Sequence, residues 1–265
     1  NVQTSRDIFM KIFNSKIKNL LYLGYRLTSP VVDPAQLVQG ITGYVWFFRD
    51  LFRYQRLSSG PSLLNTNLYP MLHDKTTHPF DAHYFYQQLW VFEHVLKNSP
   101  KEHIDISSSY EMSGYLSKIV KTRFVDYRPL DTHLRNLSVE QGDILHLLFK
   151  DNTVPSLSCL HVIEHIGLGR YGDPIDPEGT RKACIELDRV LSKKGRLYLS
   201  TPIGKPRVCF NAHRIHDPQE LLSFFPTLHI ESFSVVDDDG VFHENVQPEK
   251  FRTLHYGCGM YLLRK

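Results

Sequence analysis

The sequence predicts an α/β fold, a mostly parallel sheet with helices on its faces, preceded by a helical extension. From about residue 100 onward, short apolar or β-branched runs alternate with segments of helical periodicity, a pattern typical of parallel sheets covered by helices. The last two candidate strands have no clear helix between them, which predicts an antiparallel pair at one sheet edge. The first 80 residues differ in character, because helical patterns there lead into a polar linker.

In the second part of the chain, the predicted strands are short and rich in branched apolar residues. They lie at 103–107, 122–127, 157–163, 196–200, 229–236 and 259–263. A further strand is expected just before Gly142. Helical periodicity predicts helices over 112–120 and 179–191. We therefore expect one α/β domain over residues 81–265.

Residues 1–80 are predicted to form a helical extension and a linker. Residues 5–27 place apolar side chains at helical spacing with lysines between them, which indicates an amphipathic basic helix. Asp33 and Pro34 have the pattern of an N-cap and a first-turn proline, so a second helix should run to about Tyr54. Residues 57–80 are rich in Gly, Pro, Ser, Thr and Asn, as in a linker or long surface loop, and 81–97 predicts a third helix.

The charge of the chain is unevenly distributed. Net charge is +3, from 31 basic and 28 acidic residues, too weak to predict nucleic-acid binding. Residues 1–60 hold eight of the basic and only three of the acidic residues. The basic helix in this segment predicts either peripheral contact with an anionic membrane or docking on the protein itself, in the same or a second copy.

The cysteines indicate a reducing compartment. Cys159, Cys184, Cys209 and Cys258 are widely spaced and form no C-x-x-C pair, which excludes a zinc ribbon and a thioredoxin-like site. Cys159 and Cys258 lie in apolar runs, so we interpret them as small buried hydrophobes. No apolar run approaches the ~20 residues of a membrane span, and the chain starts at Asn1 without a signal-peptide pattern. We expect a cytoplasmic protein, with membrane contact at most peripheral.

In an open parallel sheet, ligands bind outside the carboxyl ends of the strands. The first strand leads through Asp105 into Ser107, and the second ends at Asp126, 21 residues after Asp105. An acidic residue at about this spacing can accept hydrogen bonds from the ribose of an adenosine cofactor. The third strand precedes Asp143, and the fourth leads into H161-V-I-E-H165.

Two consecutive blocks carry a family resemblance. They are QGDILHLLFKDNTVPSLSCLHVIEHIG, which starts at Gln141, and RKACIELDRVLSKKGRLYLSTP, which ends at Pro202. In this order they resemble class I S-adenosylmethionine-dependent methyltransferases, over about residues 82–265. The chain is also similar to a less characterised methyltransferase-like family of unknown function found in bacteria and nematodes. The resemblance implies a doubly wound, seven-stranded Rossmann-like sheet with an antiparallel C-terminal hairpin, and S-adenosylmethionine as cofactor.

The resemblance also implies roles for the residues that contact the cofactor. They are Asp105 and Ser107 at the methionine end, Asp126 at the ribose, Asp143 and Ile144 at the adenine, and His161 and Glu164 beside the cofactor. Three of these acidic residues have a structural alternative. Asp126 would be a cap or a surface acid, Asp143 a turn residue, and Glu164 with His165 a helix-start pair.

One departure from the family is a turn without glycine. After the first strand the sequence has Ser107-Ser108-Ser109 where the family has a glycine-rich turn. Serine resists the positive φ angles that glycine adopts easily. The alternative to an enzyme is therefore a non-catalytic methyltransferase-like protein for binding or assembly. A third hypothesis is a transferase that uses a nucleotide-linked donor on the same sheet.

The acceptor is expected at the strand ends that carry histidines. His213 is the first choice of general base and His165 the second, since an imidazole titrates near neutrality. Arg214 and Tyr171 are predicted to contact the acceptor, a small molecule or glycan that offers a hydroxyl or carboxyl group. The alternative for this segment is a helix start capped by Asp217, which would explain Asp217 but not His213.

Residues 169–180 form an insert that is atypical of the family. Asp173, Asp176 and Glu178 could bind Mg²⁺ or Ca²⁺, but two Asp-Pro pairs with glycines are more simply two turns. We expect no metal site. A loop of this length over the strand ends could instead be a lid on the acceptor pocket.

Overall fold

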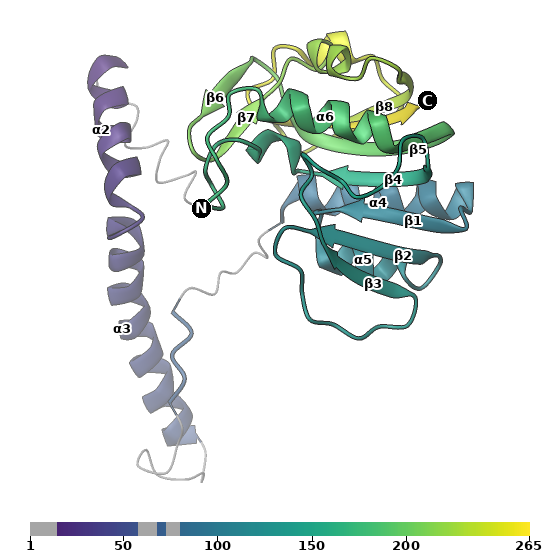
Figure 1. The fold of residues 1–265 in the computed structure, drawn as a ribbon. Helices are drawn as coiled ribbons and strands as arrows, with labels where there is room; N and C mark the ends of the chain where they lie inside the picture. The colour runs from purple at the N-terminus through teal and green to yellow at the C-terminus, as the bar shows by residue number, and fades with distance from the viewer. Residues whose placement is uncertain (1–14, 58–67, 73–79) are drawn as a thin grey trace. The chain divides into compact units, whose positions relative to one another are not determined.

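The computed structural model describes residues 15–57, 68–72 and 80–265, and the chain divides into two compact units, 1–79 and 80–265 (Figure 1). Residues 5–14 of the predicted basic helix and most of the predicted linker lie outside the described residues. The two units are described separately below.

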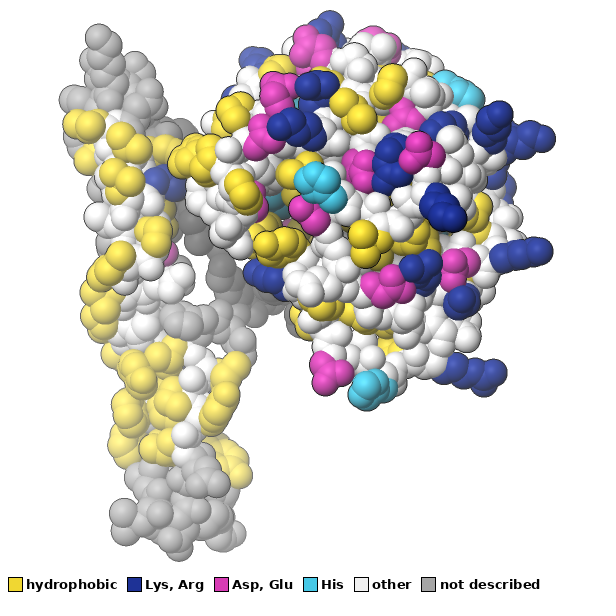
Figure 2. Space-filling view, in the orientation of Figure 1, with side chains coloured by type: hydrophobic (Ala, Val, Ile, Leu, Met, Phe, Trp, Pro, Cys, Tyr) yellow, Lys and Arg dark blue, Asp and Glu magenta, His cyan; other side chains and the backbone are white. Residues whose placement is uncertain are grey.

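The described residues of the first unit include the helices α2 (Ser15–Thr28) and α3 (Pro34–Leu57). The predicted cap of α3 is confirmed, because Asp33 Oδ1 accepts a hydrogen bond from the Gln36 N–H at 3.3 Å. Many apolar side chains of these helices are exposed within the unit, and Figure 2 shows them along its surface. None of the helices described is long and apolar enough to cross a membrane.

The second unit is built on an eight-stranded sheet of order β3-β2-β1-β4-β5-β10-β8-β9. The strands are β1 (Glu102–Ile106), β2 (Lys121–Asp126), β3 (Leu137–Gln141), β4 (Val154–Leu160), β5 (Leu191–Ile203), β8 (His229–Val236), β9 (Phe242–His243) and β10 (Gly257–Arg264). Strands β1 to β5 are parallel, and β10 is antiparallel to both β5 and β8. The predicted fold class and antiparallel pair are confirmed. The two-residue strand β9 adds an eighth strand to the expected seven.

Helices cover both faces of this sheet (Figure 1). Helices α4 (Ala82–Asn98) and α5 (Tyr110–Leu116) bury apolar side chains on one face. Helix α6 (Gly179–Val190) and the 3-10 helix η3 (Glu220–Phe224) pack on the other. The remaining elements are the hairpin of β6 (Arg207–Cys209) and β7 (His213–Ile215) and the 3-10 helices η2 (Ile163–His165) and η4 (Pro248–Phe251).

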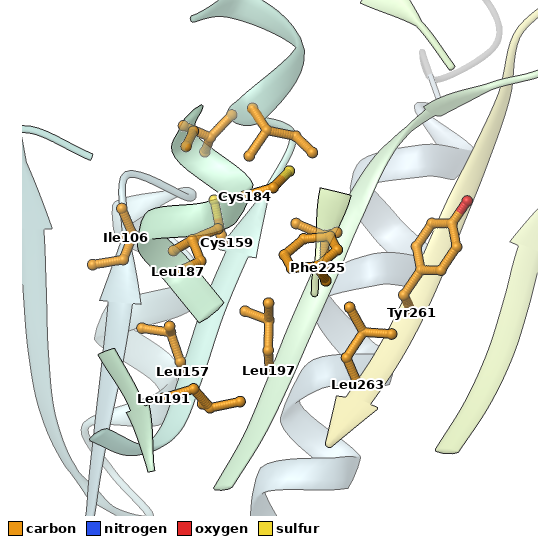
Figure 3. Packing of buried hydrophobic residues seen from close by; sticks show 14 of the residues in the cluster. Ile106, Leu157, Cys159, Cys184, Leu187, Leu191, Leu197, Phe225, Tyr261 and Leu263 are labelled. Atoms are coloured by element: carbon orange, nitrogen blue, oxygen red, sulfur yellow. The ribbon is translucent and has the colours of Figure 1, made fainter. Parts of the chain in front are cut away.

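The larger core lies between the sheet and α6. Leu157, Leu197 and Leu263 come from β4, β5 and β10, and Leu187 of α6 belongs to the same buried cluster (Figure 3). Each is almost completely removed from water, which stabilises the fold by about 1.5–3 kcal/mol per side chain. The continuous apolar strands of the sequence are therefore buried on both faces, as a parallel sheet requires.

The register of the sheet brings the carboxyl ends of the parallel strands, where site residues are expected, to one edge. Ile106 pairs with Val125 and Asp126 with Gln141, so β1, β2 and β3 end together. Strand β10 runs the opposite way, and its second residue, Cys258, pairs with Pro202 near the end of β5. The beginning of β10 thus lies at the same edge as the carboxyl ends of the parallel strands.

Candidate functional site

Asp105 is fully buried and bonded to three hydroxyl groups. Its carboxylate accepts hydrogen bonds from Ser108 at 2.6 Å, Ser113 at 2.5 Å and Ser158 at 2.5 Å. Burial raises the pKa of Asp105 to about 6, although these hydrogen bonds lower it. The carboxylate joins β1, α5 and β4. These contacts give Asp105 a structural role, and its contact with the methionine end of a cofactor stays a prediction.

The serine turn after β1 adopts the conformation for which the family uses glycine. Ser107 has φ 53°, in the left-handed region, and both its N–H and its hydroxyl donate to the Val125 carbonyl. Ser108 Oγ also accepts from the Leu160 N–H at 3.0 Å, and Ser109 caps α5. Local hydrogen bonds hold this backbone in place and thereby offset the strain that a side chain suffers there.

Two carboxylates stand at the ends of β2 and β3. Asp126 Oδ1 accepts from the Arg128 N–H at 2.7 Å, and Asp143 Oδ1 accepts from the Leu145 N–H at 2.8 Å. Both residues thus make the turn contacts of their structural alternatives. Among the described residues, Asp126 Oδ2 has no hydrogen bond, and Asp143 Oδ2 has only His146 Nδ1, at 3.5 Å.

Ile144 follows Asp143 but faces the other way. Its side chain is buried in the core between the sheet and α6. The structure therefore does not present this side chain at the strand ends, where its contact with adenine was expected.

His161 and Glu164 form a buried pair directly after β4. His161 Nδ1 lies 2.8 Å from Glu164 Oε1, and both side chains are almost fully enclosed. Burial disfavours the charged imidazole, but Cys258 and Glu164 raise the pKa of His161 well above its ordinary value. Burial likewise opposes the carboxylate, and yet His161 holds the pKa of Glu164 below its usual range. Thr201 of β5 donates to the second oxygen of Glu164 at 3.3 Å.

Aromatic rings gather around His161. His161 stacks near Tyr84 and His83, with ring centroids 5.5 and 5.8 Å away, and Tyr256 lies 5.3 Å from His83 and 5.1 Å from His213. We call His83, Tyr84, His161, His213, Tyr256 and Cys258 the histidine cluster. Burial is the main cause that lowers the pKa of His83 to about 4, and the nearby His161 adds to it. The His83 imidazole is therefore neutral at pH 7. His213 is half-buried, and burial also lowers its pKa.

His165 lies beside this cluster and contacts Tyr171, which belongs to the insert. His165 Nδ1 is 2.7 Å from the Ala212 carbonyl, so it donates there, and Nε2, which lies 3.8 Å from Glu164 Oε1, is left unprotonated. Burial lowers the pKa of His165. The Tyr171 ring packs edge-on against His165, and the Arg128 guanidinium lies 4.5 Å from its centre. The insert therefore reaches from the end of β4 to the segment after β2.

Arg214 is committed to the protein itself. Its guanidinium donates to the carbonyls of Ile166, Asp176 and Pro177 and to the Thr180 hydroxyl. The side chain anchors the insert to β7, and its contact with an anionic acceptor stays a prediction. All four of these hydrogen bonds come from Nη1 and Nη2 of the guanidinium.

The acidic residues of the insert make turns. Asp173 accepts from the backbone N–H groups of Gly167, Gly169 and Tyr171, and Asp176 pairs with Lys182 at 2.7 Å. Glu178 pairs with Arg181. These contacts fit the two-turn interpretation of the insert. Asp217 accepts from the N–H groups of Gln219 and Glu220, so the capped start is also present, as a 3-10 helix.

Sequence reasoning missed four of the six residues of the histidine cluster. His83 and Tyr84 lie in the first turn of α4, Tyr256 directly precedes β10, and Cys258 is the second residue of β10. The available signal was topological: an antiparallel last strand begins where the parallel strands end. Cys258 is buried as predicted, but it lies next to the site as well as in the core.

Comparisons with known proteins agree with this architecture. The model of a family described as "Caenorhabditis protein of unknown function, DUF268" matches residues 151–247. No curated protein matches the chain. The N-methyltransferase NodS from Bradyrhizobium japonicum, solved in complex with S-adenosylhomocysteine, superposes with a TM-score of 0.50 at 11% identity, covering 74% of this chain and 91% of NodS.

A second solved structure is that of the Burkholderia thailandensis 1,6-didemethyltoxoflavin N1-methyltransferase, also with bound S-adenosylhomocysteine. It has a TM-score of 0.49 at 12% identity and covers 72% of this chain and 93% of that enzyme. Identities this low show fold and not activity. The second unit of this chain has the Rossmann-like fold of class I methyltransferases, and part of it matches a family whose function is unknown.

Proposed function

We propose that the protein is an S-adenosylmethionine-dependent methyltransferase that acts on a hydroxyl or carboxyl group of a small-molecule or glycan acceptor. The observation that carries the proposal is that acidic side chains and histidines occupy different parts of the edge where the parallel strands end. Asp126 and Asp143 stand at the ends of β2 and β3. At the other side, near the end of β5 and the beginning of β10, burial lowers the pKa values of His83, His165 and His213. The first side suits an adenosine, and the second suits an acceptor that must lose a proton.

The residues at the first side fit the adenosine part of the cofactor. The free oxygen of Asp126 would accept from the ribose hydroxyls, and Asp143 Oδ2 from the adenine amino group. The Ser107 turn already has the left-handed backbone at which the family brings glycine to the methionine part. S-adenosylmethionine, when bound, supplies a methyl group activated by a positively charged sulfur.

His213 is the proposed general base at the second side. Its imidazole is half-buried and its pKa is lowered, so at pH 7 it is neutral and able to accept a proton. His165 Nε2 is the second candidate, because Nδ1 is held by Ala212. A carboxylate acceptor is already ionised and would need neither base. Tyr171 would then cover the acceptor from the insert.

Calorimetric titration with S-adenosylhomocysteine tests the cofactor site. Asp126→Ala should weaken binding by roughly 10–100-fold, because hydrogen bonds to a charged group contribute about 1.5–3 kcal/mol. The matched control is Asp131→Ala, an exposed acid of the β2–β3 connection. His213→Ala should leave binding unchanged. The proposal fails if the wild type binds no ligand, or if Asp126→Ala binds as tightly as the wild type.

One observation favours a non-catalytic protein as a second candidate. Ser108 Oγ bonds at once to Asp105 and to the Leu160 N–H, so it bridges the turn after β1 and the end of β4. This bridge fixes the turn beside which a cofactor would bind. Absence of S-adenosylhomocysteine binding in both the wild type and Ser108→Gly would favour this candidate.

A further inference from the structure

Three metal-binding side chains converge in the histidine cluster. His83 and His161 each offer an imidazole nitrogen and Cys258 offers its sulfur, and these three atoms lie within 4.8 Å of one another. They come from α4, the end of β4 and the beginning of β10, which are 78 and 97 residues apart in the chain. No local motif joins them, so only the fold brings them together.

The ring of His161 leaves one nitrogen unused. Nδ1 is bonded to Glu164 at 2.8 Å, whereas Nε2 is buried and has no hydrogen-bond partner among the described residues. A buried polar atom without a partner is costly, by about 1–3 kcal/mol. His83 makes no side-chain hydrogen bond in the described part of the chain either. Two imidazole nitrogens are thus available beside the Cys258 thiol.

Glu164 stands where metal sites place a supporting carboxylate. A histidine that binds a metal ion commonly donates its other N–H to a carboxylate, which fixes the ring and increases its basicity. The His161–Glu164 contact has this arrangement, and Thr201 in turn holds the second carboxylate oxygen.

We propose that His83, His161 and Cys258 bind a Zn²⁺ ion, with Glu164 as the positioning residue behind His161. Zinc favours nitrogen and sulfur ligands, and its tetrahedral ligand atoms lie roughly 3.4–3.6 Å apart. The observed cluster therefore has to close by little more than about 1 Å. Three protein ligands leave a fourth position for water or an acceptor. Binding of an acceptor at the fourth position rests on the proposed methyl transfer. Binding of the zinc ion itself is independent of that proposal.

The test is zinc titration of the full chain after treatment with a chelator. We expect one Zn²⁺ per chain by calorimetry, and Co²⁺ in its place should show a thiolate charge-transfer absorption with the visible bands of a tetrahedral ion. His83→Ala and Cys258→Ser should each weaken zinc binding at least tenfold, and Cys258→Ser should abolish the charge-transfer band. Glu164→Gln should weaken affinity by about 10–100-fold and keep the band.

Matched controls separate this site from unspecific binding. Cys209→Ser removes a less buried cysteine, and His133→Ala an exposed histidine; neither should change affinity or absorption. Thermal melting without metal shows whether each variant is folded. Failure of the wild type to bind zinc, or equal binding by His83→Ala and Cys258→Ser, overturns the proposal. Rapid alkylation of Cys258 without any zinc binding overturns it in favour of a Cys–His–Glu nucleophile.

Discussion

At the scale of single residues, buried polar side chains tie the central strands together. His103 of β1 is fully buried between two hydroxyls of β4, with Nδ1 2.7 Å from Ser156 Oγ and Nε2 2.9 Å from Ser158 Oγ. Ser158 also donates to Asp105. A neutral imidazole satisfies both contacts, one as donor and one as acceptor. The network therefore depends on a histidine that stays uncharged.

His103 predicts an acid sensitivity of folding. Burial lowers its pKa to about 3 in the folded protein, against 6.5 for an ordinary histidine. Below pH 6.5, His103 therefore binds a proton in the unfolded chain but stays unprotonated in the folded protein. The free energy of unfolding falls for this reason as the pH decreases to about 3. Within this range, His103 lowers the free energy of unfolding by roughly 1.4 kcal/mol for each pH unit of acidification.

Urea unfolding of the wild type and His103→Gln at pH 7 and pH 5 measures this contribution. Glutamine keeps a donor and an acceptor but does not titrate, so the variant should lose less stability on acidification. The lowered pKa values of His83 and His216 act in both proteins and largely cancel in the comparison. Parallel pH dependences in the two proteins would contradict the prediction.

At the scale of elements, the insert after η2 is an ordered loop with internal supports. Asp173 accepts hydrogen bonds from three backbone N–H groups in and just before the insert. Arg214 of β7 donates to the carbonyls of Ile166 and Asp176. At Gly167, φ is +80° and the Asp176 carbonyl approaches so closely that no Cβ would fit. The loop carries Tyr171, so its order decides where that ring lies.

Arg214→Met should loosen this loop. The substitution keeps much of the apolar volume but leaves buried carbonyl oxygens without donors, at about 1–3 kcal/mol for an unsatisfied group. We expect faster hydrogen exchange over residues 167–178 and faster tryptic cleavage after Arg170, which is exposed. Arg181→Met, which removes an exposed pair with Glu178, is the control. Unchanged exchange in Arg214→Met would show that the loop does not depend on this anchor.

At the scale of the whole molecule, the first unit exposes an apolar helix face for which the α/β fold gives no reason. Ile41, Val45, Phe48 and Phe52 follow one another at i, i+4, i+7 and i+11, and each is at least 44% exposed. This spacing places all four on one face of α3, near Arg49 and Arg53. Such a face suits the surface of an anionic membrane, one of the two partners predicted from the basic N-terminal segment.

We expect the full chain to sediment with anionic lipid vesicles at low salt. Val45→Asp with Phe48→Asp should weaken this binding more than tenfold, because each buried apolar side chain contributes about 1.5–3 kcal/mol. Gln36→Asp with Gln39→Asp adds the same charge away from that face and should have a smaller effect. Loss of a dimer in the first variant, without vesicle binding by the wild type, would contradict the membrane assignment and support self-association.

The sequence by itself determined the fold class, most of the strands and the edge at which a ligand would bind. It did so because periodicity and β-branched runs are local properties of the chain. It also identified Asp126, Asp143, His161 and Glu164 as strand-end residues, since a parallel sheet brings its carboxyl ends to one edge.

Only the tertiary structure decided which of these side chains face the edge. The sequence predicts that Asp105 and Arg214 contact ligands, but in the structure Asp105 bonds to serine hydroxyls and Arg214 to carbonyl oxygens. These contacts join segments far apart in the chain, and no local pattern of residues predicts them. His83 and Cys258 meet His161 because α4 starts, and the antiparallel β10 begins, where β4 ends. Long-range topology sets such proximity, and a linear pattern of residues carries no measure of it.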